Sequence, residues 1–72
     1  MVEHMLKASL ERGRIITIIY SGESGISERN IKVLEIQDHK IKAYCYLRKQ
    51  IRYFKFENIL SAAYYNLRRS AV

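Results

Sequence analysis

The sequence predicts a mainly β protein, with an N-terminal helix followed by a small barrel of five antiparallel strands. Two observations support this fold class. Apolar residues recur at helical spacing only near the N-terminus. The rest of the chain consists of short β-rich segments separated by turns at intervals of about eight to twelve residues, which is typical of a small barrel. Closing the sheet also removes unpaired strand edges, which a short chain would otherwise expose.

The helix is expected over residues 2–12. Its apolar residues recur three and four positions apart and form one stripe, which consists of Val2, Met5, Leu6 and Leu10. Gly13 follows at a position where helices often end in a left-handed residue. A helix of this length is marginally stable alone, so its apolar stripe is expected to cover the barrel.

Five strands are expected between residues 14 and 65. The first, 14–20, is apolar on both faces, which indicates burial against the barrel interior on one side and under the helix on the other. The second spans 27–36, and the third has its apolar face at Ile41, Ala43 and Cys45. The fourth begins at Gln50, and a tight connection at 56–59 leads to the last strand at about 60–65.

The 72 residues are expected to form one domain over 1–66, with a flexible tail at 67–72. A chain this short buries only about 60% of its unfolded surface, and a homo-oligomer would bury more. Cys45 is the single cysteine, which favours a reducing, cytoplasmic location without disulfides.

Several functional classes have no support in the residue pattern. No Cys/His spacing suits a metal ion, and no apolar run is long enough to span a membrane. No nucleophile, base and acid occur in a recognisable constellation. We therefore expect no metal, no cofactor, no membrane insertion and no enzymatic activity.

The formal net charge of +6 is concentrated in residues 40–55. Two alternating apolar and polar runs flank a polar step at 48–50, which predicts a β-hairpin. The hairpin holds six Lys or Arg residues, no Asp or Glu, and four aromatic rings, whereas the rest of the chain has seven basic and seven acidic residues. A basic, aromatic β-hairpin indicates an anionic partner.

Each half of this hairpin has a functional and a structural interpretation. Arg52 shares strand parity with Phe54 and Phe56, which are expected in the core, so it must reach a barrel mouth, contact an anion, or pair with Glu57. On the third strand, Lys40, Lys42, Tyr44 and Tyr46 lie on one face. That face suits phosphates and stacked bases of a single strand, or it is a solubilising outer surface.

The hairpin run Ala43-Tyr44-Cys45-x-Leu47-Arg48-x-x-Ile51-Arg52-x-Phe54-Lys55-x-Glu57-x-Ile59 resembles the core of the WYL domain. Two upstream segments are similar to the same family: Glu11-Arg12-Gly13-Arg14 before a strand that ends in Tyr20, and Glu28-Arg29 before Ile31 and Val33. The name-giving Trp-Tyr-Leu tripeptide is absent, and His39-Lys40-Ile41 occupies its place. The chain thus resembles a short, stand-alone member that lacks the tripeptide.

The resemblance implies an Sm-like or SH3-like barrel of the kind attached to many bacterial transcriptional regulators, with nucleic acids or nucleotide-like molecules as ligands. It implies that Arg48, Arg52 and Lys55 are basic contacts and that Tyr44 and Phe54 are the rings beside them. Together with the residues chosen by charge and position, the candidate ligand-binding set is Lys40, Lys42, Tyr44, Arg48, Lys49, Arg52, Phe54 and Lys55.

Two functions are expected from these observations. The first is a ligand-sensing module of bacterial transcription regulation that binds a nucleic acid or nucleotide-like anion through the hairpin, with a separate DNA-binding regulator as a protein partner. The alternative is a protein-interaction or oligomerisation module that has no nucleic-acid ligand.

Overall fold

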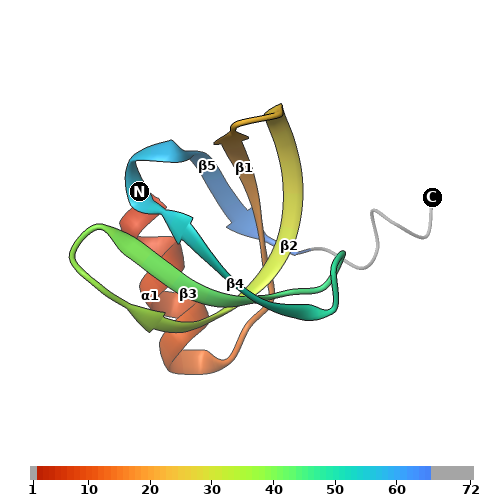
Figure 1. Cartoon of the computed structure of the whole chain (residues 1–72). Helices are drawn as coiled ribbons and strands as arrows, with labels where there is room; N and C mark the ends of the chain where they lie inside the picture. Colours follow the sequence, from red (N-terminus) through yellow and green to blue (C-terminus); the bar gives the residue numbers. More distant parts are fainter. Residues whose placement is uncertain (1, 66–72) are drawn as a thin grey trace.

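The computed structural model describes residues 2–65 and shows one helix followed by one five-stranded antiparallel sheet (Figure 1). The elements in chain order are α1 (Val2–Arg12), β1 (Ile16–Gly22), β2 (Gly25–Ile36), β3 (Lys40–Cys45), β4 (Gln50–Lys55), the 3-10 helix η1 (Phe56–Asn58) and β5 (Ile59–Tyr64). Across the sheet the strands follow the order β4-β3-β2-β1-β5. The predicted fold class is confirmed, and the predicted tail at 67–72 lies outside the described residues.

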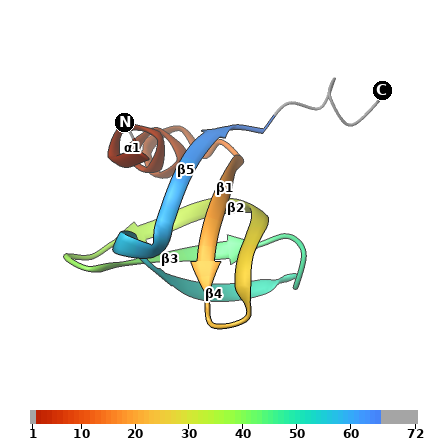
Figure 2. The ribbon, with the colours of Figure 1, turned by 90° about the horizontal axis from the view of Figure 1, so that it is seen from above.

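The long strand β2 pairs with two different neighbours. Its first half pairs with β1 as far as Ile31, which is opposite Ile16. Its second half pairs with β3 from the same Ile31, which is opposite Cys45. A register shift between Val33 and Glu35 accompanies the turn of the strand from one partner to the other. The sheet therefore curls around its own interior instead of lying flat (Figure 2).

The core lies inside this curled sheet, because every second residue of a strand faces inward. The inward residues of β3 are the predicted Ile41, Ala43 and Cys45, and all three are fully buried. Phe54 of β4 is also buried, whereas Phe56 is 39% exposed although its parity predicted a core position. The alternation ends at Lys55 because η1 begins at Phe56 and redirects the chain.

The helix covers one end of the barrel and packs mainly on β2 and β5 (Figure 2). The prediction that it covers the first strand is correct only in part, because the helix contacts β1 but packs more extensively on β2 and β5. The predicted stripe is correct in part. Leu6 is buried and Val2 and Met5 pack against the core, but Leu10 is 39% exposed, and the small residues Ala8 and Ser9 face the sheet instead. Small side chains let the helix approach the strands closely.

The buried hydroxyl of Ser9 fastens the helix to the barrel. Ser9 Oγ donates to the carbonyl of Arg14 at 2.6 Å and accepts the backbone N–H of Val33 at 2.9 Å. Because β1 begins only at Ile16, β2 has no strand neighbour beyond Ile31 on that side, and the Val33 N–H would otherwise have no partner. Gly13, with a φ of +66°, turns the chain from the helix into this contact.

Replacing Ser9 by Ala should lower the free energy of unfolding by about 1–3 kcal/mol, because it leaves a buried donor and a carbonyl without their partner. The free energy is measured by urea unfolding at equilibrium. Ser61→Ala on the exposed surface of β5 is the matched control and should change it by less than about 0.5 kcal/mol. Equal stability of Ser9→Ala and the parent would show that this contact does not hold the helix in place.

Candidate functional site

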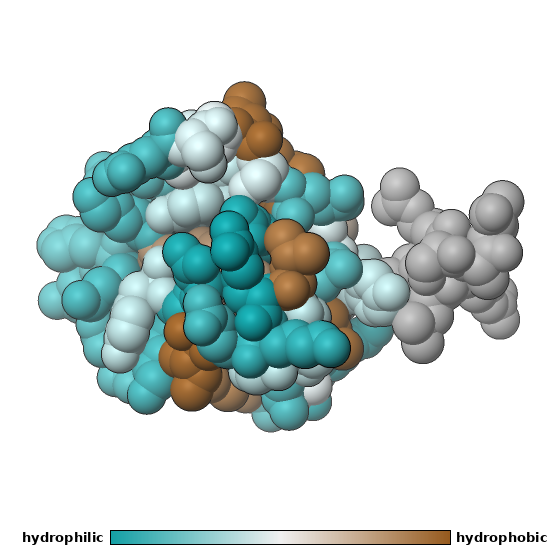
Figure 3. Space-filling model, turned by 45° about the vertical axis from the view of Figure 1, so that its right-hand side comes forward, coloured by the Kyte–Doolittle hydropathy of each residue, from teal (hydrophilic) through white to brown (hydrophobic). Residues whose placement is uncertain are grey.

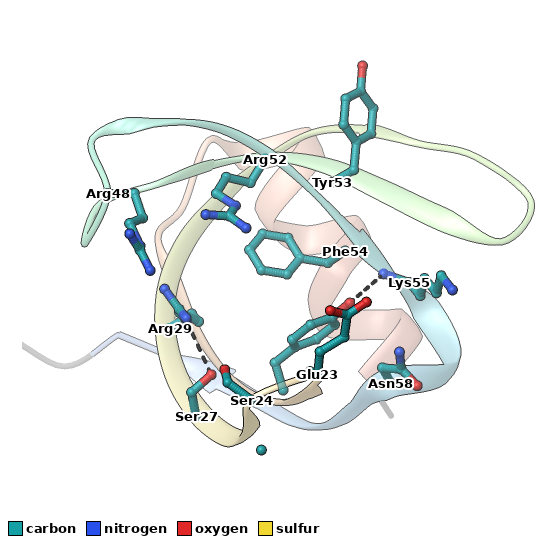
Figure 4. A pocket seen from close by; sticks show the side chains of 13 residues that line it. Glu23, Ser24, Ser27, Arg29, Arg48, Arg52, Tyr53, Phe54, Lys55 and Asn58 are labelled. Carbon is teal, nitrogen blue, oxygen red and sulfur yellow. Dashed lines mark hydrogen bonds between the residues drawn. The ribbon is translucent and has the colours of Figure 1, made fainter.

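A cleft of about 420 Å³ opens between the β1–β2 hairpin on one side and β4 with the β3–β4 turn on the other. This volume is in the range of pockets that hold small molecules. Hydrophilic side chains also dominate the middle of the face of the molecule shown in Figure 3, where hydrophobic side chains reach the surface only in separate groups. Figure 4 shows the side chains that line the cleft.

Three arginines from three different elements converge on one side of the cleft (Figure 4). Arg29 comes from β2, Arg48 from the β3–β4 turn and Arg52 from β4. A guanidinium group is protonated at any ordinary pH, so this side of the cleft carries three permanent positive charges. Planar guanidinium groups hold phosphate or carboxylate oxygens through paired hydrogen bonds.

Strand alternation explains why these arginines meet. Arg29 lies two residues before the buried Ile31, and Arg52 lies two residues before the buried Phe54, so both belong to the inward rows of their strands. Their rows continue past the apolar core to the open mouth of the barrel. The prediction that Arg52 reaches a barrel mouth agrees with this position.

The three guanidinium groups have no acidic partner within residues 2–65. Arg29 Nε donates to Ser27 Oγ at 3.2 Å, and the side chains of Arg48 and Arg52 form no ion pair or hydrogen bond with a described residue. The structural alternative, an ion pair between Arg52 and Glu57, is therefore absent. Glu57 lies in η1 and is exposed. No carboxylate of the described residues therefore pairs with these three guanidinium groups.

The rings of Tyr20 and Phe54 form the apolar part of the cleft. Their centroids are 5.0 Å apart, with an angle of 82° between the planes, which is an edge-to-face contact. Tyr20 Oη accepts the backbone N–H of Lys55 at 3.2 Å and so bridges β1 to the free edge of β4. Phe54 is only 4% exposed, so it supports the site from beneath and does not offer a free face.

The structure divides the predicted binding residues between two faces. Arg48, Arg52, Phe54 and Lys55 line the cleft. Lys40, Lys42 and Tyr44 lie on the outer face of β3, because they alternate with its buried residues. The single basic surface expected from the hairpin is thus two surfaces separated by the sheet. The distribution of charge along the sequence does not show this separation.

The outer face has its own internal contacts. Lys40 Nζ lies 5.1 Å from the centre of the Tyr53 ring, a cation–π distance, and Tyr44 contacts Tyr46 edge to face at 4.9 Å. Figure 4 shows Tyr53 pointing away from the arginines. Lys49 belongs to neither group, since its side chain does not line the cleft. Its φ of +55° is the one left-handed non-glycine backbone among the described residues and shapes the turn that carries Arg48.

Arg29, Tyr20 and Glu23 all line the cleft, although none of them was among the binding residues predicted from the sequence. Arg29 belongs to a segment that resembles the WYL family, and Tyr20 ends the first predicted strand. Their positions on the inward rows of β1 and β2 were the available signal. The position of Glu23 at the cleft follows only from the register of the β1–β2 hairpin. This register places Gly22 opposite Gly25 and leaves Glu23-Ser24 as a two-residue turn. The strands thus extend further toward this turn than predicted.

Residues 2–65 contain no group of three or more His, Cys, Asp or Glu side chains that could hold a metal ion. None of their helices has the length and apolarity needed to cross a membrane. A smaller hollow of about 190 Å³ lies between α1 and Tyr64.

Comparison with known proteins gives a likeness of fold alone. No family model matches the sequence, and no curated protein matches it. Among solved structures, the chain is similar to proteasome accessory factor B/C (PafBC) of Arthrobacter aurescens, with a TM-score of 0.78 and 18% sequence identity. The match covers 86% of this chain but only 11% of the PafBC chain. The similarity supports a WYL-like fold for this domain.

Proposed function

We propose that this chain is a non-catalytic regulatory module that binds a nucleic acid or a nucleotide-like anion in the arginine-lined cleft. One observation carries the proposal: Arg29, Arg48 and Arg52 converge on a cleft in which no acidic side chain of residues 2–65 pairs with them. A phosphate bound there would accept hydrogen bonds from guanidinium groups and offset their mutual repulsion. The likeness of fold to PafBC, a regulator with a WYL domain, supports the regulatory part.

The proposal changes the binding residues expected from the sequence. The cleft contributes Arg29, Arg48 and Arg52, with Lys55 at the rim. Lys40, Lys42 and Tyr44 on the outer face are a second basic surface that a long strand could reach after passing over β4. They are not needed for a ligand of the size of one nucleotide.

A protein-interaction role is the second candidate, and a different observation favours it. Ile51 and Tyr53 are 51% and 55% exposed on the outer face of β4, which is an edge strand of the sheet. Exposed apolar residues beside a free strand edge are common features of surfaces that join to another chain.

The cleft proposal predicts how salt affects binding of a short single-stranded oligonucleotide. For about four phosphate contacts, log K should fall with log salt at a slope near −3. The double variant Arg48→Ala/Arg52→Ala should flatten the slope by about 1.4 units, because it removes two of those contacts. Fluorescence anisotropy at several salt concentrations measures the slope.

Lys40→Ala/Lys42→Ala is the matched control for this experiment. It removes the same charge from the outer face of the same hairpin, and it should leave the slope nearly unchanged. The cleft proposal fails if the two double variants, both folded, flatten the slope equally. It also fails if neither of them alters binding.

The protein-interaction role predicts association of the chain with itself. Sedimentation equilibrium should then show dimers or larger species at micromolar concentrations. Ile51→Lys/Tyr53→Lys should weaken the association at least tenfold, because it places charge on the apolar surface. Ile26→Lys is a control at another exposed apolar position, since Ile26 is 69% exposed at the β1–β2 hairpin. A parent protein that remains monomeric at high micromolar concentration would eliminate self-association.

A further inference from the structure

The cleft is electrically uneven along its length. Glu23 is the one acidic residue among the thirteen described residues that line it. Figure 4 shows Glu23 near Lys55 and Asn58, away from the side where the three arginine guanidinium groups gather. A bound phosphate is attracted to the arginine side and repelled by the carboxylate. The ligand group that lies against Glu23 must therefore offer hydrogen-bond donors.

The β1–β2 turn places the Glu23 carboxylate at the cleft, and no described residue pairs with this carboxylate. Glu23-Ser24 is the two-residue turn between Gly22 and Gly25, and Gly25 has a φ of +112°. The turn is short, so the paired hairpin keeps the backbone of Glu23 at the mouth of the cleft. Glu23 forms no ion pair or hydrogen bond with any described residue. Both carboxylate oxygens are available to a ligand.

Elementary base chemistry distinguishes the ligands that could satisfy two adjacent acceptors. The Watson–Crick edge of guanine presents two neighbouring donors, N1–H and the N2 amino group. Adenine and cytosine present one amino group beside a ring nitrogen that accepts, and uracil presents one N–H between two carbonyl oxygens. A single-stranded or free base exposes this edge to a protein. Stacking adds little selectivity here, because the buried Phe54 is already in contact with Tyr20.

We propose that Glu23 makes the cleft selective for guanine, with the nucleotide phosphate on the arginine side and the guanine Watson–Crick edge against the carboxylate. This inference rests on the proposed function and adds the identity of the base. The same chemistry is present in a free guanine nucleotide and in a guanine within a single strand. Glu23 is then the residue that determines specificity, while the arginines supply most of the affinity.

The test compares GMP, IMP and AMP by calorimetric titration at low salt. IMP lacks only the N2 amino group of GMP, so it reports on the second donor. The parent should bind GMP at least about fivefold more tightly than AMP, with IMP between them, which is the lower limit for one bidentate base contact. Glu23→Gln should bind GMP and AMP within twofold of each other, because it loses one of the two acceptors and the negative charge.

Two further binding measurements complete this test. Glu28→Gln removes the same charge from an exposed position of β2 that does not line the cleft, and it should keep the preference for GMP. A hexauridylate with one internal guanosine, compared with plain hexauridylate, tests guanine within a strand. A preference that appears only in the oligonucleotides and disappears in Glu23→Gln supports the inference with a strand as the source.

The outcomes separate this inference from the function on which it rests. If the parent binds nucleotides or strands with no preference for guanine, or if Glu23→Gln retains the preference, the guanine assignment is wrong while the anion-binding cleft stands. If no phosphate-bearing probe binds the parent at all, the proposed function fails and the assignment of Glu23 fails with it.

Discussion

The double pairing of β2 is the constraint on which the rest of this structure depends. One residue, the fully buried Ile31, is opposite Ile16 on one side and Cys45 on the other. By serving both neighbours, β2 curls a five-stranded sheet into a barrel that a chain of 72 residues can fill. Ser9 lies at the point where the pairing of β2 with β1 ends. Its hydroxyl accepts a hydrogen bond from the Val33 N–H, which would otherwise be unpaired.

The same curvature produces the cleft. Inward rows that are apolar in the middle of the barrel continue to its mouth, where Arg29 and Arg52 replace apolar side chains and the β3–β4 turn adds Arg48. Cations tolerate this position because the mouth is open to water, so their desolvation is small. Because no carboxylate of the described residues pairs with them, their mutual repulsion costs energy, and a bound anion would relieve it. The fold thus creates an anion-attracting site from residues that are distant in sequence.

The sequence predicted the helix, the five strands and the buried face of β3 because each depends on local periodicity. The binding surface depends on register and closure, which a single sequence does not display. Lys42 and Arg52 are both basic and belong to one hairpin, yet parity sends them to opposite faces of the sheet. Arg29 and Glu23 join the site only through the β1–β2 hairpin register. The prediction that Phe56 is buried was wrong because η1 interrupts the strand alternation on which it was based.

The central claim is that the ligand occupies the inward cleft and not the outer face of the same hairpin. Nuclear magnetic resonance of the labelled protein, titrated with a short single-stranded oligonucleotide, tests it most directly. The account predicts that the side-chain Nε–H signals of Arg29, Arg48 and Arg52 shift together with a single dissociation constant, while the backbone signals of Lys42 and Tyr44 barely change. Large shifts of Lys42 and Tyr44 with unmoved arginine signals would contradict it and place the interface on the outer surface.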